Sequence, residues 1–255
     1  MPTPHLSHSA AAAPRNRIVA SAEIIAAADA AGTTRLPVLR SQAPLVLRRT
    51  PEAIYLVGGA AGPIGGDELA LRIEVRDGAT LRVRTAAASV ALPGPDGLES
   101  VLAVTATVGR GACLEYLPEP VVVADGARHA TDLTVTLAED ARLLLRDELI
   151  LGRHGEKGGA CRASLRIDYD GRPLLRQALA VGGADEASLG PAILARHRAV
   201  GAVLRVDPAR GANMRARCGP LVAVMPLAGP GILVTALAHD AVTLRKRLSC
   251  LAPAS

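Results

Sequence analysis

Aromatic side chains are almost absent from this 255-residue chain, which has no phenylalanine, no tryptophan and three tyrosines. Proteins that hold single-stranded nucleic acids or sugars commonly stack them on aromatic rings. The composition therefore disfavours both classes of ligand. Because hydrophobic residues still make up 49% of the chain, we expect a core of alanine, valine, leucine and isoleucine.

Several motifs of enzymes and metal sites are also missing from the sequence. It contains no Gly-x-Ser-x-Gly elbow and no His-Glu-x-x-His zinc motif. No two cysteines are spaced as Cys-x-x-Cys, so a zinc knuckle is not indicated. The cysteines fit reduced thiols as well as two disulfides, and they are Cys113, Cys161, Cys218 and Cys250.

The distribution of charged residues along the sequence does not indicate a nucleic-acid-binding surface. The net charge of +5 comes from 29 basic and 24 acidic residues, which are scattered along the chain. The run Arg245-Lys246-Arg247 is the only basic cluster, and it is too short to indicate a DNA partner. We therefore expect no nucleic acid among the partners.

The N-terminal segment differs in composition from the rest of the chain. Residues 1–17 lack a basic leader and an apolar region of secretory length, so we expect a disordered tail and a cytoplasmic protein. Residues 18–255 are expected to form one β-rich domain.

One uncharged stretch, residues 218–238, is long enough to raise the question of a membrane span. Its three prolines and its glycines would break a spanning helix. Two buried strands, Leu221–Met225 and Ile232–Leu237, fit the pattern better. We therefore expect no contact with a membrane.

Apolar and polar residues alternate with a period of two through most of the chain, which indicates β-strands. Variations of one tight turn recur at intervals of roughly 30 residues, each between two alternating runs. These turns are Asp77–Leu81, Arg110–Leu114 and Glu139–Leu143. The repeat predicts a mainly β fold of stacked hairpins or solenoid-like sheets, and Asp170-Gly171 predicts a further hairpin.

About two helices are expected to flank these sheets in the C-terminal half. Residues 186–200 have room for one helix, with Pro191 near its first turn. The second is predicted over residues 240–251, because Asp240 suits an N-cap and apolar residues follow at helical spacing.

A glycine-rich loop, Gly58–Asp67, separates two alternating runs. It has no lysine, and residues 69–76 after it alternate as a strand, so neither a Walker loop nor a dinucleotide fingerprint is indicated. Two other interpretations stay open. The loop is either a flexible surface turn or a shaped wall whose glycines leave room for a partner or an ion.

Acidic side chains recur where the predicted strands end. They are Asp67, Glu115, Glu119, Asp147 and Glu148. If the repeats stack, these carboxylates can line one passage or one face. Oxygen ligands alone hold a borderline ion such as nickel weakly, which fits transit rather than storage. The alternative is a set of solvated acids paired with the many arginines.

Five segments, taken together over residues 40–248, resemble the UreD (UreH) family of urease accessory proteins. They are Gly58–Asp67, Gly78–Thr85, Leu114–Pro118, Asp147 with Leu151–Arg153, and Asp170–Leu175. Their order and spacing carry the resemblance more than any one of them does. The residues after Thr85 depart from the family pattern, because they lack its basic and aromatic positions.

The resemblance implies a non-enzymatic chaperone of urease maturation. Such a protein binds apo-urease and a helical accessory protein of the UreF type, which recruits a nickel-carrying GTPase of the UreG type. It also implies a passage that nickel crosses transiently, and no organic cofactor. By match of motif, the metal-transit residues would be Asp67, Glu115 and Asp147, and the passage or interface residues Gly65, Gly66, Thr85 and Arg153.

This resemblance leads to one expectation that can be tested directly. Replacing Asp67 and Asp147 with alanine is expected to lower urease activation without loss of folding. Two rival functions remain open: a β-rich interaction module with no metal role, and an enzyme that uses paired acids as a glycosidase does.

Overall fold

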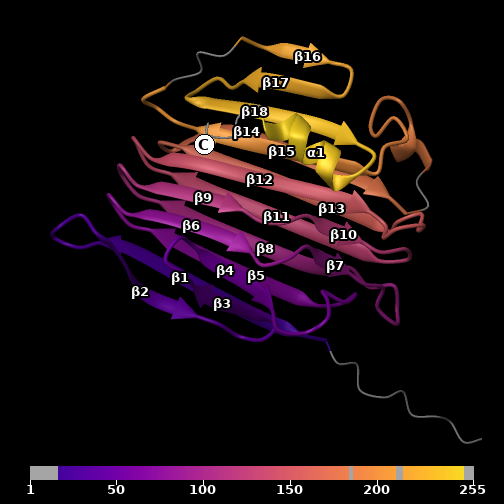
Figure 1. The fold of residues 1–255 in the computed structure, drawn as a ribbon, viewed down its shortest axis with the longest axis horizontal. Coiled ribbons are helices and arrows are strands. Elements are labelled where there is room, and N and C mark those ends of the chain that lie inside the picture. The colour runs from indigo at the N-terminus through magenta and orange to yellow at the C-terminus, as the bar shows by residue number, and fades with distance from the viewer. Residues whose placement is uncertain (1–16, 184–185, 211–214, 250–255) are drawn as a thin grey trace, which may run out of the picture.

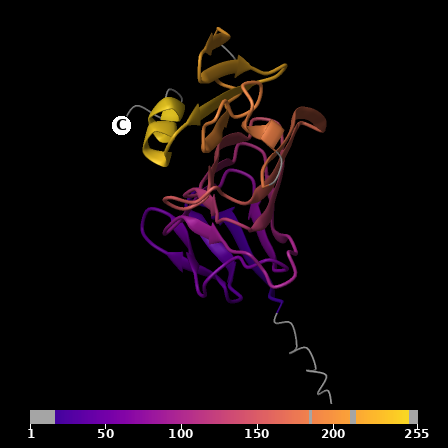
Figure 2. The same cartoon turned by 90° about the vertical axis from the view of Figure 1, so that its right-hand side faces the viewer.

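The computed structural model describes residues 17–183, 186–210 and 215–249. In these ranges the strands stack from one end of the molecule to the other (Figure 1). They form two sheets that face each other, with one α-helix of the described residues on the outer side of one of them (Figure 2). The mainly β fold class predicted from the sequence is confirmed.

The first sheet has seven strands. They are β1 (Val19–Ala28), β2 (Thr34–Arg40), β5 (Glu68–Val75), β8 (Ser100–Val108), β11 (Arg128–Leu137), β13 (Ala160–Tyr169) and β14 (Arg172–Gly182). Their spatial order is β14-β13-β11-β8-β5-β1-β2.

The second sheet has eleven strands. They are β3 (Leu45–Arg49), β4 (Ile54–Gly58), β6 (Thr80–Thr85), β7 (Ser89–Ala91), β9 (Cys113–Leu117), β10 (Val121–Val123), β12 (Arg142–Leu151), β15 (Ala199–Val206), β16 (Arg217–Gly219), β17 (Val222–Pro226) and β18 (Gly231–Ala238). The main path runs β16-β17-β18-β15-β12-β9-β6-β4-β3, and β10 joins it by pairing with β12 and β7.

The recurrent tight turns join one sheet to the other, so the repeat is a coil rather than a hairpin. β5, β8 and β11 each pass through such a turn into β6, β9 and β12 of the facing sheet. Successive coils stack in parallel, with Leu71 opposite Val104 and Val104 opposite Leu133. The hairpin predicted at Asp170-Gly171 is confirmed, because β13 and β14 pair antiparallel there.

Alternate residues of each strand point into the space between the sheets and form the core. Along β5, Leu69, Leu71, Ile73 and Val75 are each at most 6% exposed. The main cluster draws on both sheets and is aliphatic apart from Tyr116, as the composition predicted. Burial of each large aliphatic side chain stabilises the fold by about 1.5–3 kcal/mol.

The C-terminal helix α1 (Ala241–Leu248) confirms the second predicted helix within the described residues. Asp240 is its N-cap, and the Asp240 carboxylate accepts a 2.8 Å hydrogen bond from the Thr243 amide. Leu244 and Leu248 are buried in a cluster with residues of β15 and β18. Within the described parts of the chain, no helix has the length and apolar character that crossing a membrane requires.

The first predicted helix is much shorter than expected. Only Glu186–Leu189 is helical, as a 3-10 turn called η1, and β15 begins at Ala199. Gly190 and Pro191 follow η1, and Ala195 and Arg196 have positive φ angles, which a continuous α-helix does not tolerate. The two strands predicted in the uncharged stretch are present as β17 and β18.

Candidate functional site: the cavities between the sheets

Asp67 fastens the N-terminal strand to the glycine loop. The residue is 2% exposed, and its carboxylate accepts hydrogen bonds from the amides of Ile18 (3.0 Å) and Ile64 (2.9 Å). Ile18 precedes β1, whereas Ile64 lies inside the loop. Because each carboxylate oxygen has a backbone donor, Asp67 stabilises the junction of two segments that are distant in sequence.

The glycine loop makes a close backbone contact with a later loop of the same chain. A Cβ atom at Gly65 would lie 2.5 Å from the Leu98 carbonyl oxygen and 2.6 Å from the Gly94 amide nitrogen. Gly66 has a φ of 98°, in a region that side chains other than glycine rarely adopt. The neighbour for which these two glycines leave room is therefore the chain itself, at the loop that contains Gly94 and Leu98.

A cavity of about 450 Å³ lies behind this loop, between the two sheets. Thr85, at the end of β6, lines it and accepts a 2.8 Å hydrogen bond from the Glu119 amide. His129 of β11 lines it from the facing sheet, with its ring nitrogens 2.9 Å from the Ser100 hydroxyl and 3.2 Å from the Thr131 hydroxyl. Burial lowers the pKa of His129 to about 4, so the ring is neutral at neutral pH.

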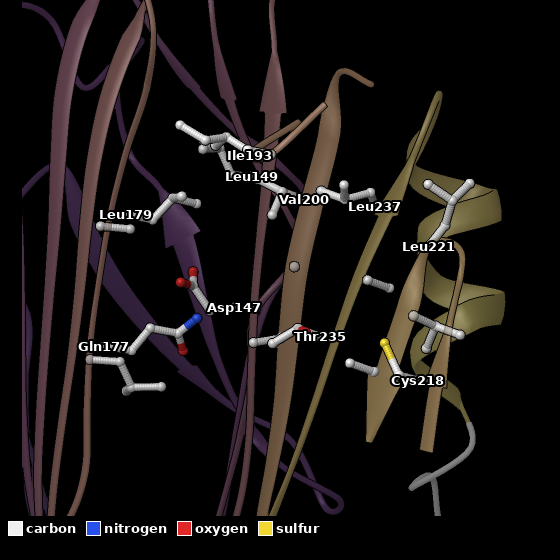
Figure 3. Close-up of a pocket in the computed structure, with 18 of the residues that line it drawn as sticks. Asp147, Leu149, Gln177, Leu179, Ile193, Val200, Cys218, Leu221, Thr235 and Leu237 are labelled. Atoms are coloured by element: carbon white, nitrogen blue, oxygen red, sulfur yellow. The ribbon is translucent and has the colours of Figure 1, made fainter. Parts of the chain in front are cut away.

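A second cavity, of about 460 Å³, lies between the sheets near β15 and contains Asp147 (Figure 3). The inward-facing row of β12 is Leu143, Leu145, Asp147, Leu149 and Leu151. Asp147 is thus a carboxylate in a row of leucines. Gln177 extends toward it from β14 of the facing sheet.

The Asp147 carboxylate is the most perturbed acid at these cavities. Burial raises its pKa to about 6, and the neighbouring charge of Glu148 adds to the shift. Its remaining accessible surface faces the cavity. Among the described residues, no side chain or backbone group forms a hydrogen bond or ion pair with this carboxylate. Asp147 can therefore accept a proton, a water molecule or a cation from the cavity.

Glu115 and Arg153 lie away from Asp147. Along β9, Leu114 and Tyr116 are buried, so Glu115 points to the outer face of the second sheet. There its carboxylate pairs with Arg84 at 2.8 Å and with Arg82 at 3.4 Å.

Arg153 lies in the loop after β12, where its guanidinium pairs with Glu156. It lines an outer groove beside α1 together with His154 and Lys246. The structure thus places Asp147 and Thr85 at inner cavities and Glu115 and Arg153 on the outside. Asp67, Gly65 and Gly66 lie in the glycine loop but do not line either cavity.

Glu148 anchors helix α1 to the outer face of β12. Its side chain is 1% exposed and forms an ion pair with Arg245 of α1 and a second, at 3.4 Å, with Arg146. Arg245 also pairs with Glu119 at 2.9 Å. Asp147 and Glu148 are adjacent in sequence, yet one faces the cavity and the other a buried ion-pair cluster, because successive strand residues point to opposite faces.

The sequence analysis did not assign His129, Gln177, Thr235 or Cys218 to a site. The alternation of leucine around Asp147 is the signal that could have placed that acid inside, whereas the other four depend on long-range strand pairing. Cys113, Cys161 and Cys218 are free thiols, and Cys250 lies outside the described residues. In the ranges that the structure describes, no group of three or more His, Cys, Asp or Glu side chains could hold a metal ion.

The fold and its cavities define a class of protein in which stacked parallel coils enclose cavities, lined mostly by apolar residues, between two sheets. Residues 20–254 match the family model described as UreD urease accessory protein, so the chain belongs to the UreD family.

Named relatives support this membership along nearly the whole chain. Urease accessory protein UreD 3 of Streptomyces griseus subsp. griseus is 51% identical over 240 residues, which cover 90% of this chain and 93% of the relative. Urease accessory protein UreD of a Parafrankia species is 46% identical over 268 residues, covering 95% and 90% respectively. The resemblance drawn from the sequence motifs is confirmed.

Proposed function

We propose that this protein acts in urease maturation as a non-catalytic scaffold, and that it offers nickel a transient passage between its two sheets. Membership of the UreD family supports the role in urease maturation. The proposal includes apo-urease, a helical accessory protein of the UreF type and a GTPase of the UreG type as partners in the cytoplasm. Nickel is the cargo in this scheme and not a resident cofactor.

The single observation that carries the passage is the unpaired Asp147 carboxylate in the inner cavity. A lone carboxylate oxygen attracts a divalent cation but does not provide the several ligands of a tight site. Nickel would therefore bind there briefly and dissociate, as transit requires. Thr85 is the inward polar residue that we place on the same passage, at the glycine-loop cavity.

The test is urease activation by complexes that contain Asp147→Asn, with wild-type chain and Glu115→Gln as references. Asparagine keeps the size of aspartate and removes its charge. We expect urease that has less nickel and less activity with Asp147→Asn, and normal assembly of the complex in a pull-down. Glu115→Gln changes the outer face only and is expected to activate urease normally.

Normal activation by an assembled Asp147→Asn complex would contradict the passage. The protein would then be better described as an interaction module without a metal role. The ion-paired placement of Glu115 on the outer face favours this second candidate for that part of the surface.

A further inference from the structure

Strand β14 lies at an edge of the first sheet, and in the described parts of the chain no strand pairs with its free side. In an antiparallel pair, every second residue bonds to the partner strand, and the residues between point their N–H and C=O groups away from it. The Gly183 amide donates to the Gly159 carbonyl on the β13 side, whereas the Gly182 amide turns away and donates to the Ser188 hydroxyl. The residues of β14 with even numbers therefore present their backbone groups to the free side.

The open part of this edge is short and bounded at both ends. We call it the β14 edge, and its members are Arg176, Ala178 and Ala180. All three are exposed, and their outward N–H and C=O groups form no hydrogen bond with any residue that the structure describes. Leu174 lies against the β17–β18 turn at Gly229, and Gly182 bonds to Ser188, so both ends of the opening are closed. At about 3.4 Å per residue the opening is about 14 Å long, which suits a strand of about five residues.

Beyond the β14 edge, the second sheet continues as an apolar shelf. On β17, Val224 is buried on the side of α1, so its neighbour Met225 faces the inner side. Met225 lies opposite Leu233 of the core and is nevertheless 36% exposed, so the inner face is uncovered here. Leu221 on this side and Leu179 of β14 line one cavity (Figure 3). A strand beside the β14 edge would therefore place every second side chain over the shelf.

The outer face of the β14 edge carries positive charge. Arg176 lies directly opposite Arg166 of β13, and both side chains are on the exposed face. Arg176 pairs with Asp168, whereas the Arg166 guanidinium forms no ion pair or hydrogen bond within the described ranges. Like charges directly opposite each other destabilise a strand pair. An acidic side chain on a strand beside Arg176 would offset this repulsion.

We propose that the β14 edge and the shelf bind an extended segment of a protein partner, which adds to the first sheet as a further strand. Apolar side chains of the segment would alternate with acidic ones, the apolar set toward the shelf and the acidic set toward Arg176 and Arg166. Main-chain hydrogen bonds supply the affinity of such strand addition, and alternate side chains supply its specificity. The inference rests on the proposed scaffold role and adds the form of one partner contact.

The chemistry of the segment is tested with two synthetic peptides of about seven residues, one of alternating glutamate and valine and one of alternating lysine and valine. Fluorescence anisotropy measures the binding of each labelled peptide to the full-length protein. We expect the glutamate–valine peptide to bind at least tenfold more tightly. Equal affinity for the two peptides would contradict an acidic segment.

The place of binding is tested by substitution at Ala178. Ala178→Pro removes one outward N–H group and leaves the bonds to β13 in place, because proline is tolerated on the free side of an edge strand. Ala178→Val is the matched control, since it adds similar bulk and keeps the N–H group. We expect Ala178→Pro to weaken binding of the glutamate–valine peptide at least tenfold and Ala178→Val to leave it unchanged.

A charge reversal gives an independent variant. Arg166→Glu provides Arg176 with an acidic neighbour inside the chain, so it is expected to fold and to bind the glutamate–valine peptide at least tenfold more weakly. It replaces Ala178→Pro if that variant fails to fold. Unchanged peptide binding by either folded variant overturns the proposal.

Hydrogen–deuterium exchange at single-residue resolution tests the contact with natural partners. The full-length chain is compared alone and in the assembled complex with apo-urease and the accessory proteins. We expect the amides of the β14 edge to exchange at least tenfold more slowly in the complex. Unchanged exchange overturns the proposal. A wild-type dimer in sedimentation that Ala178→Pro converts to a monomer also overturns it, because the edge would then pair with a second copy.

These outcomes separate the contact from the functions proposed above. Slowed exchange at the β14 edge, combined with normal activation by Asp147→Asn, supports the contact and removes the nickel passage. Unchanged exchange with low activation by Asp147→Asn removes the contact and leaves the passage. If the chain binds the glutamate–valine peptide but forms no complex with urease and the accessory proteins, the scaffold role is wrong and the mode of strand addition stands.

Discussion

Substitution of Asp67 is expected to destabilise the protein rather than to block a passage. The Asp67 carboxylate accepts one hydrogen bond from Ile18 and one from Ile64, and it is 2% exposed. Asp67→Ala removes both acceptors and leaves two amides at a junction that water hardly reaches. The strand β1 and the glycine loop would then lose the side chain that joins them.

The expected magnitude follows from the two hydrogen bonds. A bond to a charged group contributes about 1.5–3 kcal/mol to stability, so Asp67→Ala is expected to lower the free energy of unfolding by about 3–6 kcal/mol. Asp67→Asn keeps one carbonyl oxygen as an acceptor and places an amide group where the second acceptor was. It should therefore lose about half as much.

Urea denaturation followed by circular dichroism measures both variants against the wild type. The order wild type, Asp67→Asn, Asp67→Ala in falling stability is the expected result. If Asp67→Ala is as stable as the wild type but activates urease poorly, our structural account is wrong and Asp67 belongs to the passage. This result also decides whether the alanine double variant of Asp67 and Asp147 is a usable test, because a misfolded protein also fails to activate urease.

Three further predictions concern ionisable side chains that are buried or that pair with a buried one. The pKa of Asp147 is raised from 3.8 to about 6, so the folded state binds more protons than the unfolded state between about pH 4 and 6, and the ionised carboxylate lowers the stability above pH 6. Asp147→Asn should therefore be about 3 kcal/mol more stable than wild type in thermal melts at pH 7.5 and equal to it near pH 4. The pKa of His129 is lowered to about 4, so the unfolded state binds more protons than the folded state as the pH falls from 6.5 to 4, and the folded state loses stability. His129→Gln should reduce this loss, which is measured as the urea midpoint against pH. Arg245→Ala leaves the buried Glu148 with Arg146 alone, and we expect a loss of about 2–4 kcal/mol in urea denaturation, against little change for Lys246→Ala.

The coil architecture could be predicted from local sequence to a large extent. The turn signals at Asp77-Gly78, Gly111 and Asp140 are local, and these three turns contain residues with φ angles between 59° and 68°. Alternation with period two then marks the strands on both sides of each turn. Whether such a turn joins neighbours in one sheet or crosses between two sheets depends on the packing of distant coils, which local pattern does not encode.

The candidate site was harder to predict, because a position at a strand end does not say which face a side chain occupies. Glu115 and Asp147 were both expected near strand ends, and both were assigned to one passage. Glu115 alternates with the buried Leu114 and Tyr116, whereas Asp147 falls in register with buried leucines. Reading the face from this alternation would have separated the two acids.

The glycine loop shows a second limit of sequence reasoning. The need for a close backbone contact could be predicted from Gly65 and Gly66, since a run of glycines indicates close approach or positive φ. The segment that makes this contact could not be predicted, because Gly94 and Leu98 belong to a later loop and no sequence signal links them to Gly65.

The opposite orientations of Asp147 and Glu148 connect the cavity to the outer surface of the protein. Glu148 is held by Arg245 of α1, and it lies directly opposite Gly201 of β15. A Cβ atom at Gly201 would lie 2.9 Å from the Asp147 carbonyl oxygen and 3.1 Å from a Leu248 methyl group of α1. The Leu248 side chain of the helix therefore packs directly on the backbone of the strand pair that holds Asp147, because Gly201 has no side chain there. A displacement of α1 would shift the backbone at Asp147, so the Arg245 variant should also alter the Asp147 pKa, which NMR titration of that carboxyl can measure.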